Sequence, residues 1–122
     1  MTSDRLTNAE LALMNLLWQT QPLTARQIRE KLYDDAKTSQ HGTVQRLLQG
    51  LEEKGFVARD RSIGVHLFST AVSLEEYGGL QLESLAEKLT GGSIAPLLTH
   101  LLDEKKLNRT EIKRLRKLLE EA

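Results

Sequence analysis

The sequence contains no cysteine, and its 17 basic side chains are balanced by 17 acidic ones. The absence of cysteine excludes disulfides, thiolate metal sites and thiol redox sensing. Zero net charge argues against a general nucleic-acid binder, because such proteins usually carry a basic surplus. It remains compatible with a dimer that binds DNA with a strong salt dependence. Any basic face must therefore arise by clustering of charges in three dimensions.

Aromatic residues and long apolar runs are also scarce. Aromatic side chains make up 4% of the residues, too few for platforms that stack on single-stranded nucleic acid. No run approaches the roughly 20 apolar residues of a membrane span, and no secretory signal is present. At 122 residues the chain is one domain, or one small domain plus an appendage. We expect a cytoplasmic protein without membrane insertion.

Motifs for catalysis and cofactor binding are missing. The 3 histidines, His41, His66 and His100, belong to different predicted elements, and none has a partner at metal-ligand spacing. There is no glycine-rich phosphate loop, no His-Glu-x-x-His and no nucleophile motif. The acidic pairs Glu52–Glu53 and Glu75–Glu76 are adjacent, so the two carboxylates of each pair point in different directions on a helix. We expect no enzyme, no metal site and no cofactor.

A helix followed by two short strands occupies residues 39–69, and the rest of the chain is organised around it. Gly55 stands where a left-handed residue commonly ends a helix. Strands are predicted over 56–59 and 65–68, which are rich in β-branched and aromatic residues, with a hairpin loop between them. Helical spacing predicts an apolar stripe made of Val44, Leu47, Leu48 and Leu51.

Two further helices are predicted before this stretch. Capping boxes at Thr7–Glu10 and Thr24–Gln27 mark their starts. The first helix runs over about 8–19 and the second over about 25–35, with Pro22 between them. The order of three helices and a hairpin predicts a mainly α fold, the winged helix-turn-helix. In that fold the third helix enters a major groove and the hairpin, the wing, lies along the DNA backbone.

The third helix would present polar side chains to a groove. Gln can bridge an adenine edge, Arg a guanine edge, and Thr can offer a methyl group to thymine. Arg26 beside the second helix, and Arg59 and Arg61 in the wing, are candidate phosphate contacts, although Arg26 is equally well explained as a solvated surface arginine. The candidate groove-facing residues of the third helix are Gln40, His41, Gly42, Thr43, Gln45 and Arg46.

The C-terminal region, 73–122, is predicted to form three leucine-rich helices. Capping boxes at Ser73–Glu76 and Asn108–Glu111 start the outer two, and Ser93 is the expected cap of the middle one. The apolar stripes of these helices consist of Leu82, Leu85, Leu89, Leu97, Leu98, Leu101, Leu102, Ile112, Leu115, Leu118 and Leu119.

A chain this small cannot easily bury all these stripes by itself. Large exposed apolar patches usually mark partner surfaces, and a symmetric dimer is the commonest solution. A two-fold dimer also suits DNA, because it places two recognition helices on successive turns of one face. We therefore predict a winged-helix domain over 1–72 and a helical dimerisation region over 73–122. The alternative is that the C-terminal helices fold back on the N-terminal core.

Several stretches resemble a known family at matched spacing over nearly the whole chain. They are Leu-Thr-x-Ala-Glu from residue 6, Leu-Leu-Trp at 16–18, Pro-Leu-Thr-Ala-Arg-Gln-Ile at 22–28, Thr-Val-Gln at 43–45, Leu-Glu-Glu-Lys-Gly-Phe-Val at 51–57, Val72-Ser-Leu-Glu-Glu-Tyr77 and Gly91-Gly-Ser93. In these motifs the chain resembles the penicillinase repressor family of winged-helix transcriptional regulators. The resemblance implies a homodimeric repressor of an inverted-repeat operator in double-stranded DNA, with Thr43, Gln45 and Arg46 on the recognition helix.

The chain departs from the family pattern at three places. Gln40-His41-Gly42-Thr43 replaces the Ser-Pro-x-Thr that often starts the third helix, and Ile63-Gly64 replaces the usual Gly-Arg of the wing. Family members that control β-lactam resistance are cut at an Asn-Phe bond under a membrane sensor protease, and His100-Leu101 stands near that position here. The copper-responsive branch uses C-terminal cysteines, which this chain lacks. The inducing signal, and any membrane sensor protease, stay open.

Two other functions stay open as well. One is a winged-helix regulator of another class, which responds to a small ligand held in an apolar cavity between its DNA-binding and dimer domains. The other is a winged helix that binds protein and not DNA, for which zero net charge is the argument. Acidic side chains around Thr43 and Arg46 would favour the latter. A basic stripe that includes Arg46, Arg59 and Arg61 would count against it.

Overall fold

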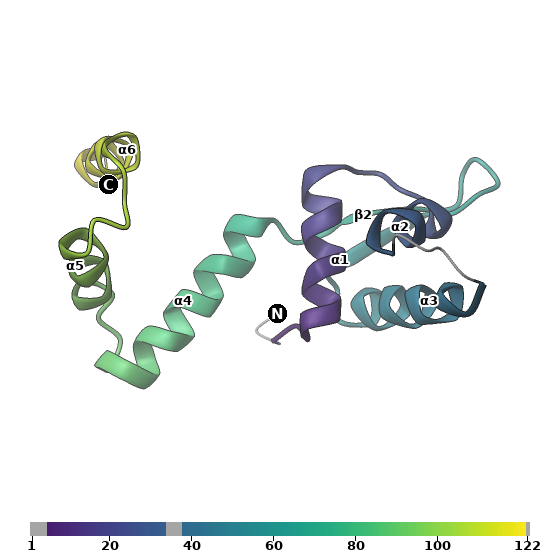
Figure 1. Ribbon diagram of the computed structural model, residues 1–122, viewed down its shortest axis with the longest axis horizontal. Helices are drawn as coiled ribbons and strands as arrows, with labels where there is room; N and C mark the ends of the chain where they lie inside the picture. The colour runs from purple at the N-terminus through teal and green to yellow at the C-terminus, as the bar shows by residue number, and fades with distance from the viewer. Residues whose placement is uncertain (1–4, 34–37, 122) are drawn as a thin grey trace. The chain divides into compact units, whose positions relative to one another are not determined.

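A computed structural model describes residues 5–33 and 38–121 (Figure 1). The described elements are α1 (Asn8–Gln19), α2 (Ala25–Leu32), α3 (Thr38–Glu53), β1 (Val57–Asp60), β2 (Leu67–Thr70), α4 (Leu74–Thr90), α5 (Ala95–Asp103) and α6 (Arg109–Glu121). This mainly helical fold with a two-stranded hairpin confirms the predicted winged helix-turn-helix. The chain divides into two compact units, Met1–Gln81 and Leu82–Ala122. The domain boundary expected after residue 72 stays a prediction.

Both predicted N-terminal capping boxes are present. At the start of α1 the Thr7 hydroxyl accepts from the Glu10 N–H at 3.1 Å, and the Glu10 carboxylate accepts from the Thr7 N–H at 2.9 Å. Thr24 and Gln27 exchange the same pair of bonds at the start of α2. The range predicted for α1 is confirmed. α2 ends at Leu32, earlier than predicted, because Tyr33 adopts an extended backbone with φ −126°.

The end of α3 follows from one glycine and its neighbours. Gly55 has a φ of 83°, as expected for a left-handed residue that ends a helix. The Gly55 N–H donates to the Glu52 carbonyl at 3.1 Å, and the Phe56 N–H donates to the Leu51 carbonyl at 2.8 Å. Leu51 and Phe56 are both buried, which supplies the apolar contact of this cap. Because Phe56 belongs to the cap, β1 begins at Val57 and not at the predicted residue 56.

The hairpin is shifted from its predicted position. β1 and β2 are antiparallel, with Val57 opposite Thr70 and Asp60 opposite Leu67. Outside the hairpin, Leu23 makes an isolated bridge to Phe68, donating to its carbonyl at 3.0 Å and accepting from its N–H at 2.8 Å. The predicted strand over 65–68 was therefore wrong at its start, because the first two of its residues lie in the wing loop before β2.

The core of the N-terminal unit lies between α1, α2, α3 and the hairpin. Trp18 is half-buried at its edge, and its indole N–H donates to the Val72 carbonyl at 3.0 Å. Tyr77 brings the start of α4 into this core, because its hydroxyl accepts from the Leu6 N–H at 3.0 Å. The buried core residues are Leu13, Met14, Leu17, Leu23, Ile28, Val44, Leu48, Leu51, Phe56, Val57, Phe68, Val72 and Tyr77.

The predicted helix starts of the C-terminal region are confirmed for α4 and α6. The Ser73 hydroxyl accepts from the Glu76 N–H at 2.9 Å, and the Asn108 side chain accepts from the Glu111 N–H at 2.8 Å. The expected Ser93 cap of α5 was wrong. Ile94 occupies the cap position without a side-chain hydrogen bond, and the Ser93 carbonyl accepts from the Thr90 hydroxyl.

Apolar side chains of the C-terminal unit are mostly uncovered. Among its described residues only Ala86 is buried. An open groove of about 280 Å³ runs between α5 and α6, lined by Leu98, Leu102, Leu107, Ile112, Leu115, Arg116 and Leu119. The predicted stripe residues that are exposed by more than a third are Leu82, Leu85, Leu89, Leu98, Leu101, Leu102, Leu115, Leu118 and Leu119. Leu97 and Ile112 are half-buried.

Candidate nucleic-acid interface

Residues from three elements of the N-terminal unit meet around one open hollow of about 440 Å³. Arg26 comes from the start of α2, and Gln45 comes from α3. His66 comes from the wing loop, which the bridge between Leu23 and Phe68 ties to the start of α2. The full lining is Thr24, Ala25, Arg26, Gln45, Val65, His66 and Phe68. The fold therefore brings two predicted site residues, Arg26 and Gln45, together with a part of the wing that was not predicted as site.

The outer face of α3 carries the predicted groove-facing residues. Gly42, Gln45 and Arg46 are exposed, whereas His41 and Thr43 are half-buried. The Gln45 amide nitrogen lies 3.3 Å from His41 Nε2, one helical turn away. Because the opposite face of α3 is fully buried in the core, this outer face is fixed in orientation. It offers amide, imidazole and guanidinium groups, which match the edges of bases in a major groove.

Gly42 is not required by the packing of the chain itself. A Cβ added there would meet nothing within 4 Å, and the residue lies in the first half of α3. The space in front of Gly42 is therefore free for another molecule to approach the backbone closely. The side chain of Gln40, which was predicted to lie beside it, falls outside the described residues.

Arg59 is held by neighbouring side chains in a way that sequence reasoning did not anticipate. Its Nη2 donates to Glu52 Oε1 at 2.9 Å, and its Nη1 lies 3.1 Å from His66 Nδ1. The guanidinium also stacks over the Phe68 ring, 4.9 Å from its centroid. The side chain is only 17% exposed. Arg59 therefore joins the last turns of α3 to the wing.

The wing loop combines an exposed arginine with two apolar side chains. Arg61 is exposed. The preceding turn is fixed by Asp60, whose carboxylate accepts from the Ser62 N–H at 2.8 Å. Hydrogen bonds from the Ser62 backbone and hydroxyl lower the pKa of Asp60. Ile63 and Val65 are 65% and 54% exposed, so the wing presents an apolar tip that sequence reasoning missed.

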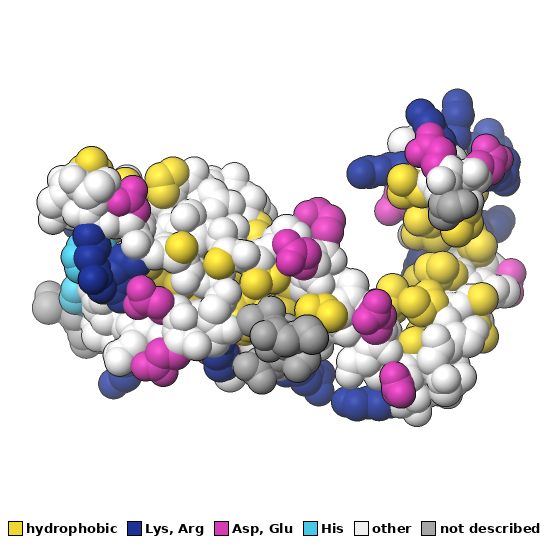
Figure 2. Space-filling view, turned by 180° about the vertical axis from the view of Figure 1, so that it is seen from behind, with side chains coloured by type: hydrophobic (Ala, Val, Ile, Leu, Met, Phe, Trp, Pro, Cys, Tyr) yellow, Lys and Arg dark blue, Asp and Glu magenta, His cyan; other side chains and the backbone are white. Residues whose placement is uncertain are grey.

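The stretch of α3 that carries the predicted groove-facing residues has no acidic side chain. Between His41 and Gln49 the sequence contains no carboxylate. Figure 2 shows histidine side chains beside Lys and Arg side chains at the left end of the view, with acidic side chains next to them. Arg26 is exposed and pairs with Glu30, at 3.0 Å on the same helix. The face can therefore accept a polyanion, although the whole chain is neutral.

A nearly buried ion pair fixes the C-terminal end of α3 against α1. Lys54 Nζ lies 2.9 and 3.0 Å from the two carboxylate oxygens of Glu10. Burial raises the pKa of Glu10, but hydrogen bonds from Lys54 and from the Thr7 N–H, together with the charge of Lys54, leave it below its ordinary value. The charged pair therefore joins the end of α3 to the first turn of α1.

The described part of the chain offers neither a metal cluster nor a membrane span. No three His, Asp or Glu side chains in it gather closely enough to hold a metal ion. None of the helices within it combines the length and the apolar character that crossing a bilayer requires.

Known proteins resemble this chain over most of their length. A penicillinase repressor of Staphylococcus aureus is 24% identical over 111 residues, which cover 91% of this chain and 87% of the relative. A penicillinase repressor of Bacillus licheniformis is 23% identical over 119 residues, covering 96% of this chain and 91% of the relative. The penicillinase repressor family model matches residues 6–121. The chain therefore belongs to the penicillinase repressor family, whose members are transcriptional regulators and not enzymes.

Proposed function

We propose that this repressor binds an inverted-repeat operator in double-stranded DNA as a homodimer, through α3 and the wing. The observation that carries the proposal is the hollow shared by the start of α2, α3 and the wing loop, beside the exposed face of α3. In a winged helix this concave surface straddles the edge of a major groove, so that the helix enters the groove and the wing follows the backbone.

The residues divide into base-reading and phosphate-binding groups. Gln45 and Arg46 are exposed on α3. The Gln45 amide can donate to and accept from an adenine edge, and the Arg46 guanidinium can donate two hydrogen bonds to a guanine edge. Arg26 lines the hollow and Arg61 is exposed in the wing loop. We assign both to phosphates, which cations contact to set the register without reading sequence. Arg59 acts through its neighbours. Its charge is paired with Glu52, and its contact with the Phe68 ring orients the wing.

His41, Gly42 and Thr43 complete the proposed reading surface at the start of α3, together with Gln40. His41 lies within 3.3 Å of Gln45 and so orients its amide. The open space before Gly42 permits a phosphate or sugar to come close to the helix backbone. These positions differ from the usual family residues, so we propose that this repressor reads an operator of its own.

The dimer is proposed from the uncovered leucines of the C-terminal unit. Leu89 and Leu119 are 64% and 75% exposed, and the groove between α5 and α6 is lined almost entirely by apolar side chains. Leaving such a surface in water is unfavourable by about 25 cal/mol for each Å² of apolar area. A second copy would cover it symmetrically and would place two α3 helices about 34 Å apart, one turn of DNA.

The two rival functions find less support. A protein-binding winged helix was expected to show acidic side chains around Thr43 and Arg46, and the α3 face between His41 and Gln49 has none. A ligand-responsive regulator was expected to hold its ligand between domains. The apolar groove of about 280 Å³ instead belongs wholly to the C-terminal unit.

Release by a membrane sensor protease is not part of the proposal. His100 and Leu101, which stand near the position of the bond that is cut in some family members, lie inside α5. A protease would need α5 to unwind locally before it could act on this bond. Binding to the chromosome does imply that the protein works in the cytoplasm, as expected from the sequence.

Paired arginine variants test the division of roles. Arg46→Ala should weaken binding to the preferred duplex by about 1–3 kcal/mol and relax the base preference at one position of each half-site. Arg61→Ala should weaken binding to all sequences alike and make the salt dependence shallower. Arg5→Ala, an exposed arginine before α1, serves as the control. If Arg46→Ala leaves both affinity and base preference unchanged in a gel-shift titration, α3 does not read the operator.

A further inference from the structure

Positive charge concentrates in one segment of the C-terminal unit, residues 105–117, outside the surface described above. The segment 105–117 carries a strong basic surplus in a chain whose net charge is zero. Its only acidic residue is Glu111, and all of its charged side chains are exposed. The basic residues of the segment are Lys105, Lys106, Arg109, Lys113, Arg114, Arg116 and Lys117.

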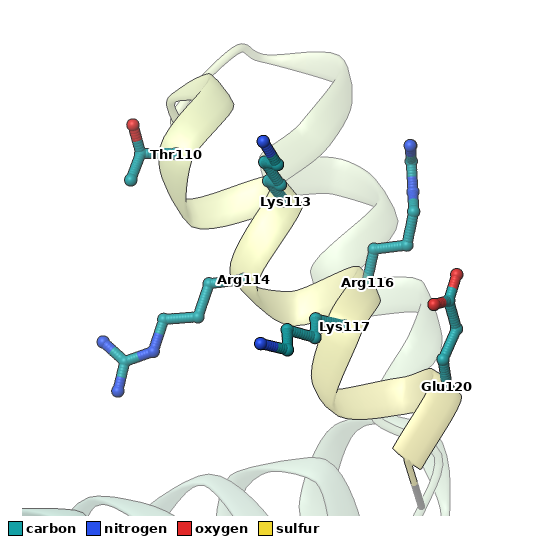
Figure 3. A pocket seen from close by; sticks show the side chains of 6 residues that line it. All are labelled: Thr110, Lys113, Arg114, Arg116, Lys117 and Glu120. Atoms are coloured by element: carbon teal, nitrogen blue, oxygen red, sulfur yellow. The ribbon is translucent and has the colours of Figure 1, made fainter.

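Four of these cations share one side of α6. Lys113, Arg114, Arg116 and Lys117 line an open hollow of about 560 Å³, together with Thr110 and Glu120. Figure 3 shows their side chains spreading outward from a single helix around this hollow. We call these four residues the basic face of α6.

The apolar residues of α6 lie on the other side. Ile112, Leu115 and Leu119 line the groove that α6 shares with α5. Figure 2 shows the same separation, with Lys and Arg side chains crowded on the outside of this unit and hydrophobic side chains gathered beneath them. Arg116 lines both the hollow and the groove, so covering the groove, by a second copy or otherwise, leaves Lys113, Arg114 and Lys117 of the basic face free.

No ion pair within the described residues neutralises the basic face. Ion pairs there join only Arg26 to Glu30, Lys54 to Glu10 and Arg59 to Glu52. Like charges three or four residues apart destabilise a helix by about 0.2–0.5 kcal/mol per pair. The cluster therefore costs stability in the free protein, and a bound polyanion would remove that cost.

We propose that the basic face of α6 is a second DNA-contacting surface, which binds the phosphate backbone of duplex DNA without reading bases. The proposal rests on the proposed function in one respect, namely that DNA is the polyanion. Arg forks match phosphate oxygens bidentately, and Lys adds point charges. A homodimer carries the face twice, so it adds phosphate contacts to those made around α3.

Duplex DNA fits this face better than an anionic membrane does. Helices that lie in a membrane surface insert an apolar side, commonly with Trp or Phe, below a basic one. α6 contains no aromatic residue, and its apolar side is shared with α5 in the groove. The residues that line the hollow all carry polar or charged groups, which suits a phosphate backbone in water.

The test is the salt dependence of binding to a long duplex that contains the preferred operator. Removing one phosphate contact makes the slope of log K against log salt shallower by about 0.9. With one phosphate per lysine in each copy, the double variant Lys113→Gln/Lys117→Gln should be shallower by about 3–4 and should keep the same base preference. Lys88→Gln is the control, because Lys88 is an exposed lysine on α4 in the same unit. It also removes one charge from each copy, and it should leave the slope unchanged.

The outcomes separate this proposal from the proposed function. An unchanged slope for the double variant overturns the proposal. If the wild type then also sediments with anionic phospholipid vesicles, the basic face binds a membrane surface and not DNA. A wild type that selects no sequence, with a double variant that still shows a shallower slope, removes the operator and keeps the second surface. Circular dichroism checks that α6 is intact, and Arg114→Gln, which lies outside the groove, provides an independent variant if the double variant loses helix.

Discussion

Replacing Lys54 by Met tests whether the ion pair with Glu10 seats α3 on α1. The change keeps most of the apolar stem of the side chain and removes its ammonium group. Glu10 would keep a carboxylate that is 8% exposed in its side chain, with the Thr7 N–H as its remaining donor. Breaking a buried pair in this way costs about 3–5 kcal/mol. Because the Lys54 side chain is itself 32% exposed, we expect a smaller cost than that range, about 2–3 kcal/mol.

The pH dependence of this cost has a definite sign. In the wild type the pKa of Glu10 is lowered, so its contribution to stability is present above the ordinary glutamate pKa of about 4.3 and is lost as the pH falls through the folded-state value. In Lys54→Met the lysine no longer opposes burial, so the pKa of Glu10 rises. Protonation then relieves the buried charge, and the difference between variant and wild type should shrink as the pH falls below about 4.

Urea unfolding followed by tryptophan fluorescence measures the stability of the N-terminal unit, where the ion pair lies. Trp18 is the only tryptophan of the chain, and it lies at the edge of the N-terminal core. Glu30→Gln is the matched control, because its ion pair with Arg26 has a similar length of 3.0 Å but side chains that are 49% and 78% exposed. Such an exposed pair contributes about 0.5 kcal/mol or less. A cost for Lys54→Met no larger than for Glu30→Gln, or one that does not shrink in acid, would refute the reasoning.

Three further substitutions have expected outcomes. Gly42→Ala should stabilise α3 by up to about 1 kcal/mol, because alanine favours a helix more than glycine does and its Cβ would meet no neighbour. The same change should weaken duplex binding in gel shifts. Unchanged DNA affinity would mean that nothing approaches that backbone. Leu115→Asp should convert dimer to monomer in analytical ultracentrifugation, whereas Leu74→Asp, also at an exposed leucine, should not; a dimeric Leu115→Asp protein excludes α6 from the interface. Arg59→Ala should lower stability by about 1–3 kcal/mol in thermal unfolding, since it leaves Glu52 without its partner; a neutral result would contradict its role in holding the wing.

Local signals in the sequence were sufficient for most helix boundaries. Thr7 with Glu10, and Asn108 with Glu111, act over one helical turn, so their pattern in the sequence is also their pattern in space. Gly55 ends α3 for an equally local reason, the left-handed backbone that glycine adopts without strain. The predicted Ser93 cap was wrong because the Ser93 carbonyl, and not its hydroxyl, forms a hydrogen bond in the turn before α5, where it accepts from the Thr90 hydroxyl.

Features that depend on distant partners were not predictable in this way. The start of β2 is set by Leu23, which pairs with Phe68 from a segment between two helices. Arg59 was expected to face phosphates, yet Glu52 and Phe68 hold it. The alternating pattern of a strand cannot reveal Leu23 as a partner of β2 or Glu52 as a partner of Arg59, because both residues lie outside the hairpin. The basic face of α6 was visible in the sequence only as scattered charges, since a balanced total concealed their clustering.

Selection of bound sequences from random duplex DNA, using the wild-type protein, tests the central claim most directly. A two-fold dimer with α3 in the major groove predicts enrichment of a palindrome whose half-sites lie about 10 base pairs apart, one helical turn. Enrichment of no sequence, with only weak binding that salt removes, would contradict the account of α3 and the wing as an operator-reading surface.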